Sequence, residues 1–200
     1  AGLPGQLVFR DQAHTEQDGV HVKFHLGARN GAAGLVHRDV KPENIIYESN
    51  DAHAPMKLTD FGCSLLADHF NRDTKWRCGR RVTRSEIVGT AGFMAPEVIS
   101  RCQYTDKADV FSLGVTLFIL LMGYAPFASD NARELLYKTV NERIEYNPRD
   151  WSAVSEDALL LVKNMLAKNP EERLSMKEVL AFPWVKNAPP TVGDGVWGDV

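Results

Sequence analysis

Cysteine is scarce in this chain of 200 residues, which contains only Cys63, Cys78 and Cys102. Three cysteines cannot all pair within one chain, and their spacing matches no metal-binding motif. The pattern therefore indicates neither a disulfide scaffold nor a structural zinc site. It is typical of proteins in a reducing compartment, so we expect a cytoplasmic location, with the nucleus left open.

Long hydrophobic runs and a large excess of one charge are also missing. The most apolar stretch, residues 109–122, is too short to span a bilayer, and Ser112, Gly114 and Thr116 interrupt it. The first residues lack the basic start and apolar run of a secretory signal. The net charge is −3, with 44% hydrophobic and 24% charged residues, values that are ordinary for one globular domain. We expect neither a membrane nor a nucleic acid as a partner.

The most informative feature that is present is an ordered set of three motifs. Residues 37–44 read His-Arg-Asp-Val-Lys-Pro-Glu-Asn, residues 60–62 read Asp-Phe-Gly, and residues 95–97 read Ala-Pro-Glu. One such tripeptide alone is common in loops and turns, but the eight-residue run and the order of the set are specific. The set resembles that of the eukaryotic protein kinase family, and the Lys at position 41 resembles its serine/threonine branch.

This resemblance implies phosphate transfer from ATP to a Ser or Thr hydroxyl of a protein substrate, a reaction that needs positioning and charge neutralisation. Asp39 would orient the attacking hydroxyl, and Lys41 would meet the transferring phosphate. Asn44 and Asp60 would bind Mg²⁺ through oxygen atoms, the ligands that this ion prefers. The resemblance therefore assigns the catalytic role to Asp39, Lys41 and Asn44, and the metal to Asn44 and Asp60.

A nucleotide site follows from the same resemblance. Ile46 would form the floor under the adenine, although the sequence equally allows a plain core residue of a strand. The residues expected to hold ATP with its metal are Lys41, Glu43, Asn44, Ile46 and Asp60.

Two short strands are expected around the motifs. Residues 45–47, Ile-Ile-Tyr, and 56–59, Met-Lys-Leu-Thr, are each typical of a short strand, and Asn50 and Asp51 between them are turn residues. The pattern predicts a small β-hairpin that delivers Asp60 at a strand end, as the catalytic loop of the family does.

The segment between residues 60 and 97 is long for a connection without structure of its own. Its middle, residues 72–84, is strongly basic: Arg72, Lys75, Arg77, Arg80, Arg81 and Arg84 stand against Asp73 alone. Two interpretations stay open: a solvated, mobile insert, or a docking or regulatory patch. In the second, Thr83 and Ser85 are candidate phosphosites, and Arg38 is the side chain that would pair with a phosphate.

The end of this segment, residues 89–97, resembles the substrate-docking loop of serine/threonine kinases. The resemblance implies that Thr90 forms hydrogen bonds near Asp39 and Lys41. A phosphate on Thr90 would crowd the catalytic carboxylate, so we do not expect this residue to be a regulatory site.

Three charged residues have structural roles in the resemblance. Glu97 would pair with Arg173, and Asp109, at the start of an apolar helix, would bind the backbone of the catalytic loop. We expect these three residues to support the site without taking part in the chemistry.

Helices dominate the second half of the chain. Residues 109–122 predict a buried helix, residues 131–141 and 155–167 predict two more, and Ser175 with Glu178 forms a capping-box pattern. The expected fold class is α+β, mainly α: a protein-kinase-like C-terminal lobe with a small β-hairpin region at the catalytic site.

Several residues near the C-terminus place the resemblance in the calcium/calmodulin-dependent kinase group. They are Trp151, residues 169–173 and residues 181–185. Phe182 stands where that group usually has His, and Phe111 stands where the family usually has Trp, so the match is not complete.

No Gly-rich phosphate loop and no strand of the Val-Ala-Ile-Lys type precede the three motifs. We therefore expect residues 35–185 to form the C-terminal lobe without its partner lobe. Residues 1–34 are Gly-rich with weak periodicity and are expected to be an atypical, poorly ordered or truncated start. Residues 186–200 are expected to form a flexible tail.

Three functions compete. The leading one is a serine/threonine protein kinase, in which Glu43 favours basic residues upstream of the target hydroxyl. The second is a catalytically inactive, kinase-like binding or scaffold module, which the missing lobe favours. The third is a small-molecule phosphotransferase, and Lys41 together with residues 89–97 counts against it.

Overall fold

The computed structural model describes residues 6–10, 21–25, 35–47, 56–66, 88–101 and 105–187. The strands are β1 (Gln6–Arg10), β2 (His21–His25), β3 (Leu35–Val36), β4 (Ile45–Tyr47), β5 (Met56–Leu58) and β6 (Leu65–Leu66). The helices are α2 (Pro96–Arg101), α3 (Asp106–Met122), α4 (Ala132–Asn141), α5 (Glu156–Met165), α6 (Met176–Ala181) and α7 (Pro183–Lys186). Short 3-10 helices cover Pro42–Asn44, Phe61–Cys63 and Asp150–Ala153.

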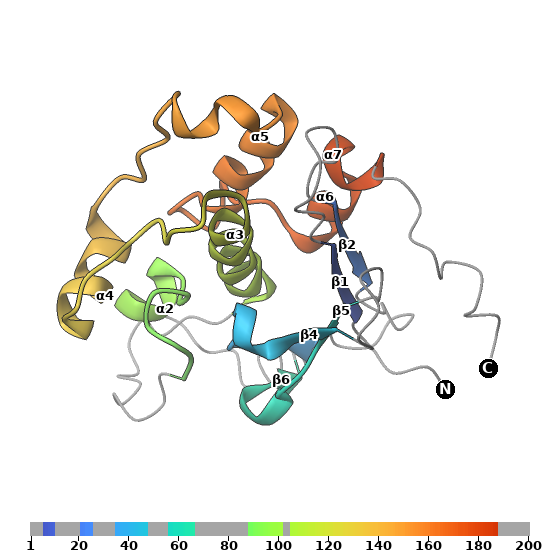
Figure 1. The fold of residues 1–200 in the computed structure, drawn as a ribbon. Helices are drawn as coiled ribbons and strands as arrows, with labels where there is room; N and C mark the ends of the chain where they lie inside the picture. The colour runs from blue at the N-terminus through green and yellow to red at the C-terminus, as the bar shows by residue number, and fades with distance from the viewer. Residues whose placement is uncertain are drawn as a thin grey trace, which may run out of the picture.

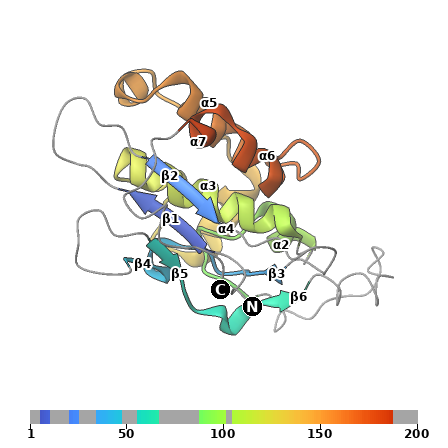
Figure 2. The same ribbon diagram turned by 90° about the vertical axis from the view of Figure 1, so that its right-hand side faces the viewer.

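Helix α3 lies in the middle of the molecule. Strands β4 and β5 lie on one side of it and helix α5 on the other, as both ribbon views show (Figures 1 and 2). Among the described residues the strands form three antiparallel pairs, β1 with β2, β3 with β6 and β4 with β5. The expected fold, mainly helical after residue 105 with a small hairpin before residue 60, is confirmed.

The hairpin of β4 and β5 positions the first residues of the candidate site. Ile45 lies opposite Leu58, and Tyr47 lies opposite Met56. Residue 59 continues from this pairing, because the N–H of Thr59 donates to the carbonyl of Asn44 at 2.7 Å. The strand therefore delivers Asp60 beside the catalytic loop.

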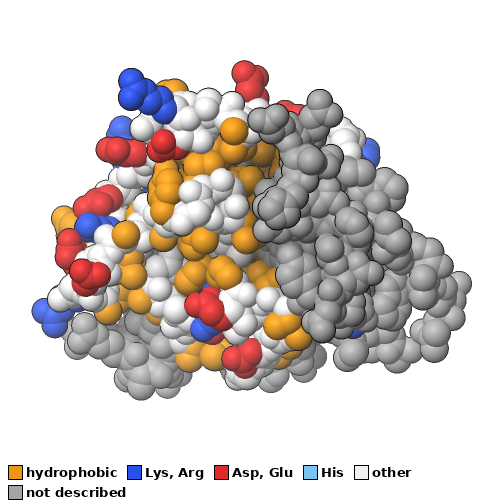
Figure 3. Space-filling model, in the orientation of Figure 1, with side chains coloured by type: hydrophobic (Ala, Val, Ile, Leu, Met, Phe, Trp, Pro, Cys, Tyr) orange, Lys and Arg blue, Asp and Glu red, His pale blue; other side chains and the backbone are white. Residues whose placement is uncertain are grey.

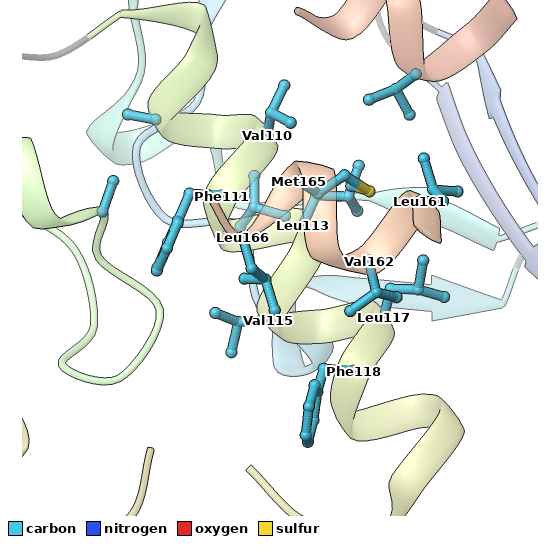
Figure 4. Packing of buried hydrophobic residues seen from close by; sticks show 14 of the residues in the cluster. Val110, Phe111, Leu113, Val115, Leu117, Phe118, Leu161, Val162, Met165 and Leu166 are labelled. Atoms are coloured by element: carbon cyan, nitrogen blue, oxygen red, sulfur yellow. The ribbon is translucent and has the colours of Figure 1, made fainter. Parts of the chain in front are cut away.

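Helix α3 is buried because it is apolar on nearly every side. Its side chains meet those of α5, among them Leu161 and Met165 (Figure 4). The two helices approach closely at Gly114, where an added Cβ would lie 2.9 Å from the Cβ of Met165. The hydroxyl groups within the helix are satisfied: Ser112 donates to the carbonyl of Phe93 at 2.8 Å, with that of Ala108 farther away at 3.2 Å, and Thr116 donates to the carbonyl of Ser112.

The helix ends follow local signals in the sequence. Helix α3 stops at Gly123, whose φ of 75° suits glycine. Helix α6 begins at the predicted capping box, in which Ser175 and Glu178 cap each other's backbone. One expectation is corrected: α3 starts at Asp106, so Asp109 lies in its first turn and not at its first residue.

Residues 1–34, expected to be an atypical, poorly ordered or truncated start, include the two strands β1 and β2. Residues 21–25, His-Val-Lys-Phe-His, alternate polar and apolar types, which is a strand signal. Phe24 lies opposite Leu7, and Val22 lies opposite Phe9. The alternation has a period of two residues and not the 3.6-residue period of a helix. The hairpin contacts β5 through β1 and α7 through β2.

Hydrophobic side chains gather near the middle of the face shown in Figure 3. Among the described residues, large apolar side chains that stay exposed are Ile46, Phe61, Leu120, Tyr124, Tyr137 and Leu160. No helix in the described part of the chain is long and apolar enough to cross a bilayer.

Some sequence expectations lie outside the described residues. They are the turn at Asn50 and Asp51, the basic stretch 72–84 with Thr83 and Ser85, Cys78, Cys102, and residues 188–200. Of the three cysteines, Cys63 is described, and it carries a free thiol.

Candidate active site

The catalytic loop, residues 37–44, is anchored to helix α3 by one carboxylate. The N–H of His37 donates to Oδ2 of Asp109 at 2.6 Å, and the N–H of Arg38 donates to Oδ1 at 2.9 Å. Arg38 has a φ of 70°, in the left-handed region that costs a non-glycine residue about 1–2 kcal/mol. Burial raises the pKa of Asp109 to about 6, although both N–H groups favour the charged form. The helix thus stabilises a loop conformation that the loop would not hold alone.

A second group of contacts surrounds the carboxylate of Asp39. The Nζ of Lys41 lies 2.9 Å from its Oδ2, and the hydroxyl of Thr90 donates to its Oδ1 at 2.7 Å. Lys41 also donates to the Thr90 hydroxyl at 2.7 Å, which closes a three-membered ring of contacts. The amide of Asn44 donates to the backbone carbonyl of Asp39 at 2.8 Å and to its Oδ2 at 3.3 Å.

These contacts fix the charges at the site. Partial burial works to raise the pKa of Asp39, but hydrogen bonds from Lys41 and Thr90 outweigh it and hold the pKa below its usual value. The hydrogen bond to Asp39 raises the pKa of Lys41, and the negative charges of Asp39, Glu43 and Asp60 add to this effect. Near neutral pH the site therefore presents a carboxylate and an ammonium group side by side.

Thr90 reaches Asp39 because of the glycine before it. Gly89 has a φ of 121°, and a Cβ at this position would lie 2.8 Å from the carbonyl oxygen of Arg38. Any other residue would push the docking loop away from the catalytic loop.

Asn44 and Asp60 have the chemistry that a magnesium ion requires. The buried Asn44 uses its amide nitrogen on Asp39, which leaves its side-chain oxygen for a cation. Asp60 is exposed, and its Oδ1 accepts the N–H of Gly62 at 3.3 Å. Two oxygen ligands from protein suit Mg²⁺, which takes its remaining ligands from phosphates and water. In the described part of the chain, no group of three or more His, Cys, Asp or Glu residues forms a separate metal cluster.

His37 links the two motifs and was not assigned a role from the sequence. Its Nε2 lies 3.0 Å from the carbonyl oxygen of Thr59, and its ring meets Phe61 edge-on at 4.8 Å between centroids. Burial lowers the pKa of His37, so the neutral ring donates this hydrogen bond. His37 thereby positions the residues on both sides of Asp60. The signal for this role is its place as the first residue of the catalytic-loop motif.

The Glu97–Arg173 pair lies deep in the core. The guanidinium binds the carboxylate through two bonds of 2.6 and 2.8 Å. Arg173 also donates to the carbonyls of Ala167, Lys107 and Lys168. The pair ties the end of the docking loop to the helical core and does not touch the cluster around Asp39.

Two apolar side chains border the site without covering it. Ile46 on β4 is 50% exposed and Phe61 is 42% exposed.

The guanidinium of Arg38 donates through Nε to the carbonyl of Cys63, directly after the Asp-Phe-Gly motif. The structure thus joins Asp39, Lys41, Asn44 and Thr90 into one cluster, and Arg38 adjoins it in the chain with its guanidinium on Cys63.

This geometry agrees with comparisons to known proteins. Residues 31–185 match the family model of the protein kinase domain. The chain belongs to the protein kinase family. Its resemblance to serine/threonine kinases of the calcium/calmodulin-dependent group is confirmed as well, since its relatives include several calcium-dependent protein kinases.

Two of these relatives show the extent of the match. Calcium-dependent protein kinase 12 of Arabidopsis thaliana is 39% identical over 152 residues, which cover 76% of this chain and 29% of that protein. Calcium-dependent protein kinase 21 of Oryza sativa subsp. japonica is 41% identical over 155 residues, which cover 78% of this chain and 25% of that protein. The chain thus spans less than a third of the length of these relatives.

Proposed function

We propose that residues 35–185 form the C-terminal lobe of a serine/threonine protein kinase that transfers phosphate from ATP to a protein hydroxyl. The observation that carries the proposal is the closed cluster of Asp39, Lys41 and Thr90. It places a carboxylate where a hydroxyl can donate to it and an ammonium group beside the same point. We also propose a cytoplasmic location, in line with the cysteine usage.

The chain's own residues account for most of the positioning. Asp39, held as a carboxylate, accepts the proton of the incoming hydroxyl and sets its direction. Lys41 offers a positive charge that stabilises the phosphate during transfer, and Thr90 keeps Asp39 and Lys41 in register. Bound ATP would supply the phosphate, and Mg²⁺ would neutralise part of the negative charge on it.

The nucleotide and its metal would lie against residues that are open to solvent. Asn44 and Asp60 would hold the ion through oxygen atoms. The exposure of Ile46 favours a floor for the adenine over the alternative of a core residue. Glu43 is exposed next to these residues and belongs to the same proposed site.

Glu43 also supports a proposal on the protein substrate. An exposed carboxylate close to Asp39 attracts positive charge, so we propose a preference for basic residues N-terminal to the target Ser or Thr. A peptide array measures this preference directly. Selection of acidic or proline-flanked targets would contradict it.

Regulation would act through Arg38. Its guanidinium lies beside Cys63 at the start of the segment between residues 60 and 97, where it can bind a phosphate on that segment. Thr83 and Ser85 remain the proposed phosphosites. The competing function, an inactive scaffold module, predicts that loss of Asp39 changes no catalytic rate.

The decisive experiment is a phosphate-transfer assay on the chain fused behind the N-terminal part of calcium-dependent protein kinase 12, because the 200 residues contain no Gly-rich phosphate loop. We expect the fusion to be far faster than the chain alone. Asp39→Asn in the fusion should lower the rate about 10²–10⁴-fold, since it removes the proton acceptor. Asp130→Asn, an exposed control, should leave it unchanged. A fusion indifferent to Asp39→Asn would favour the scaffold function.

A further inference from the structure

A surface groove of about 480 Å³ lies between the end of α4, the residues that follow it and α5. Figure 1 shows the connection between α4 and α5 on the side of the molecule away from β1, β2 and α7. Val140, Ile144, Tyr146 and Leu166 give the groove an apolar lining. None of its lining residues belongs to the catalytic loop or the docking loop, so it is distinct from the active site.

The charge of the groove differs from that of the whole chain. The groove is lined by three basic residues, Arg143, Lys163 and Lys168, and by one acidic residue, Glu142. The whole chain, in contrast, has a net charge of −3. Within the described residues, neither Arg143 nor Lys163 has a carboxylate partner. The Nζ of Lys163 lies 5.1 Å from the centre of the Tyr146 ring, so a cation and an aromatic surface meet inside the groove.

Lys168 is the third cation, and it is half-buried. Its Nζ donates to the carbonyl of Thr139 and lies 4.2 Å from the centre of the Phe127 ring. Burial lowers the pKa of Lys168 to about 8, and the charge of Glu142 only partly offsets this. A cation withdrawn from water is usually paired with an anion. The described part of the chain gives Lys168 no carboxylate in direct contact, so a ligand in the groove could supply one.

We propose that this groove binds an acidic peptide segment of a partner protein, with one aromatic or aliphatic side chain of the segment seated on the apolar lining. The three cations would pair with carboxylates on either side of that anchor. A small inorganic anion would leave the lining of Val140, Ile144 and Leu166 uncovered. A nucleic acid carries its charge along an extended backbone, and the three cations of this one groove would neutralise few of its phosphates.

The test measures fluorescence polarisation of a labelled peptide on the full 200-residue chain. The probe carries Glu at all positions except one central Trp. Two further probes replace either the Glu residues by Lys or the Trp by Ser. We expect saturable binding of the first probe, no binding of the Lys probe and much weaker binding of the Ser probe. Equal binding of the Trp and Ser probes would overturn the proposal, because it would remove the role of the apolar lining.

Charge reversal locates the binding site. Arg143→Glu with Lys163→Glu should weaken binding by at least about tenfold, because two attractive charges become repulsive. Arg133→Glu with Lys186→Glu changes the net charge equally at exposed positions outside the groove and should leave the affinity unchanged. Equal losses of affinity in the two double variants would show non-specific attraction and contradict the proposal. Matching thermal unfolding curves of the two variants would confirm that both are folded.

Two measurements separate the remaining outcomes. In an NMR titration, the pKa of Lys168 should rise when the probe is bound, and an unchanged pKa would contradict the proposed pairing. Residues 188–200 include Asp194, Trp197 and Asp199 and are themselves acidic with an aromatic residue. If a chain ending at Asn187 binds the probe far more tightly than the full chain, this segment and not a partner occupies the groove.

Discussion

Two acid–base pairs of similar length lie in different regions of the molecule. Arg173 and Glu97 are 2.6 Å apart in the core, with 0% and 5% of their side chains exposed. Lys41 and Asp39 are 2.9 Å apart at the candidate active site, with 19% and 11% exposed. The two pairs show how the surroundings of an ion pair decide whether it stabilises the fold or stays available for chemistry.

The core pair leaves no donor unused. Nε of Arg173 binds the carbonyl of Ala167, and the two Nη atoms bind Glu97 and the carbonyls of Lys107 and Lys168. A guanidinium has five N–H groups in a fixed plane, so this arrangement permits one geometry only. Such a pair holds segments together and cannot exchange partners.

The active-site pair is less constrained. Lys41 donates to Thr90 and contacts Asp39, which leaves part of its ammonium group for a third partner. Its flexible stem allows that partner to be a ligand. The pair can therefore hold the unliganded site together and still turn toward a phosphate.

We expect the largest effect when a substitution breaks the core pair. Glu97→Ala leaves the charge of Arg173 buried and unpaired, which should lower the free energy of unfolding by about 3–5 kcal/mol. Urea unfolding of the chain measures this change. Glu171→Ala, at an exposed position without an ion pair among the described residues, is the matched control and should change little. A loss of unfolding free energy no larger than that of the control would contradict a structural role for the core pair.

We expect the next largest effect when a substitution breaks the active-site pair. Lys41→Met keeps the stem and removes the charge, so the phosphate-transfer rate of the fused protein should fall about 10²–10³-fold. The free energy of unfolding should change by less than about 1 kcal/mol, because the pair is partly solvated. Lys177→Met, exposed on α6, should affect neither quantity. A large loss of stability with an intact rate would reverse the assignment of the two pairs.

A smaller, pH-dependent effect concerns Asp109, which joins the two regions. Asp109→Asn offers one acceptor for the two N–H groups of His37 and Arg38, so we expect a loss of about 1–3 kcal/mol in unfolding free energy near neutral pH. Urea unfolding of both proteins at several pH values measures the difference.

The direction of the pH dependence follows from the buried carboxyl. Its folded pKa of about 6 lies above the usual 3.8, so the folded protein binds the proton more strongly than the unfolded chain. The stability that protonation contributes is fully present below about pH 4 and is lost as the pH rises through about 6. The original chain should therefore lose stability relative to Asp109→Asn over this range. Parallel curves for the two proteins would contradict the raised pKa.

Local signals predicted much of the fold. The helix α6 and its capping box, the end of α3 at Gly123 and the strands β4 and β5 follow from residues that are close together in the chain. The hairpin of β1 and β2 shows the limit of this approach. Its alternating pattern is present in residues 21–25, but the surrounding residues 1–34 are Gly-rich with weak periodicity, so the sequence predicted only an atypical start.

The sequence by itself determined the family and the chemical types at the site, because the reaction requires a carboxylate, an ammonium group and oxygen ligands at short, fixed spacings. The family resemblance implied that Thr90, Asp109 and Arg173 support the site, but only the tertiary structure brings these distant residues together with their partners. Thr90 meets Asp39 across 51 residues, Asp109 meets His37 across 72, and Glu97 meets Arg173 across 76. The groove beside α5 is likewise a product of packing. Contacts of this kind depend on how α3 packs against the loops and helices around it, and no short stretch of residues specifies that packing.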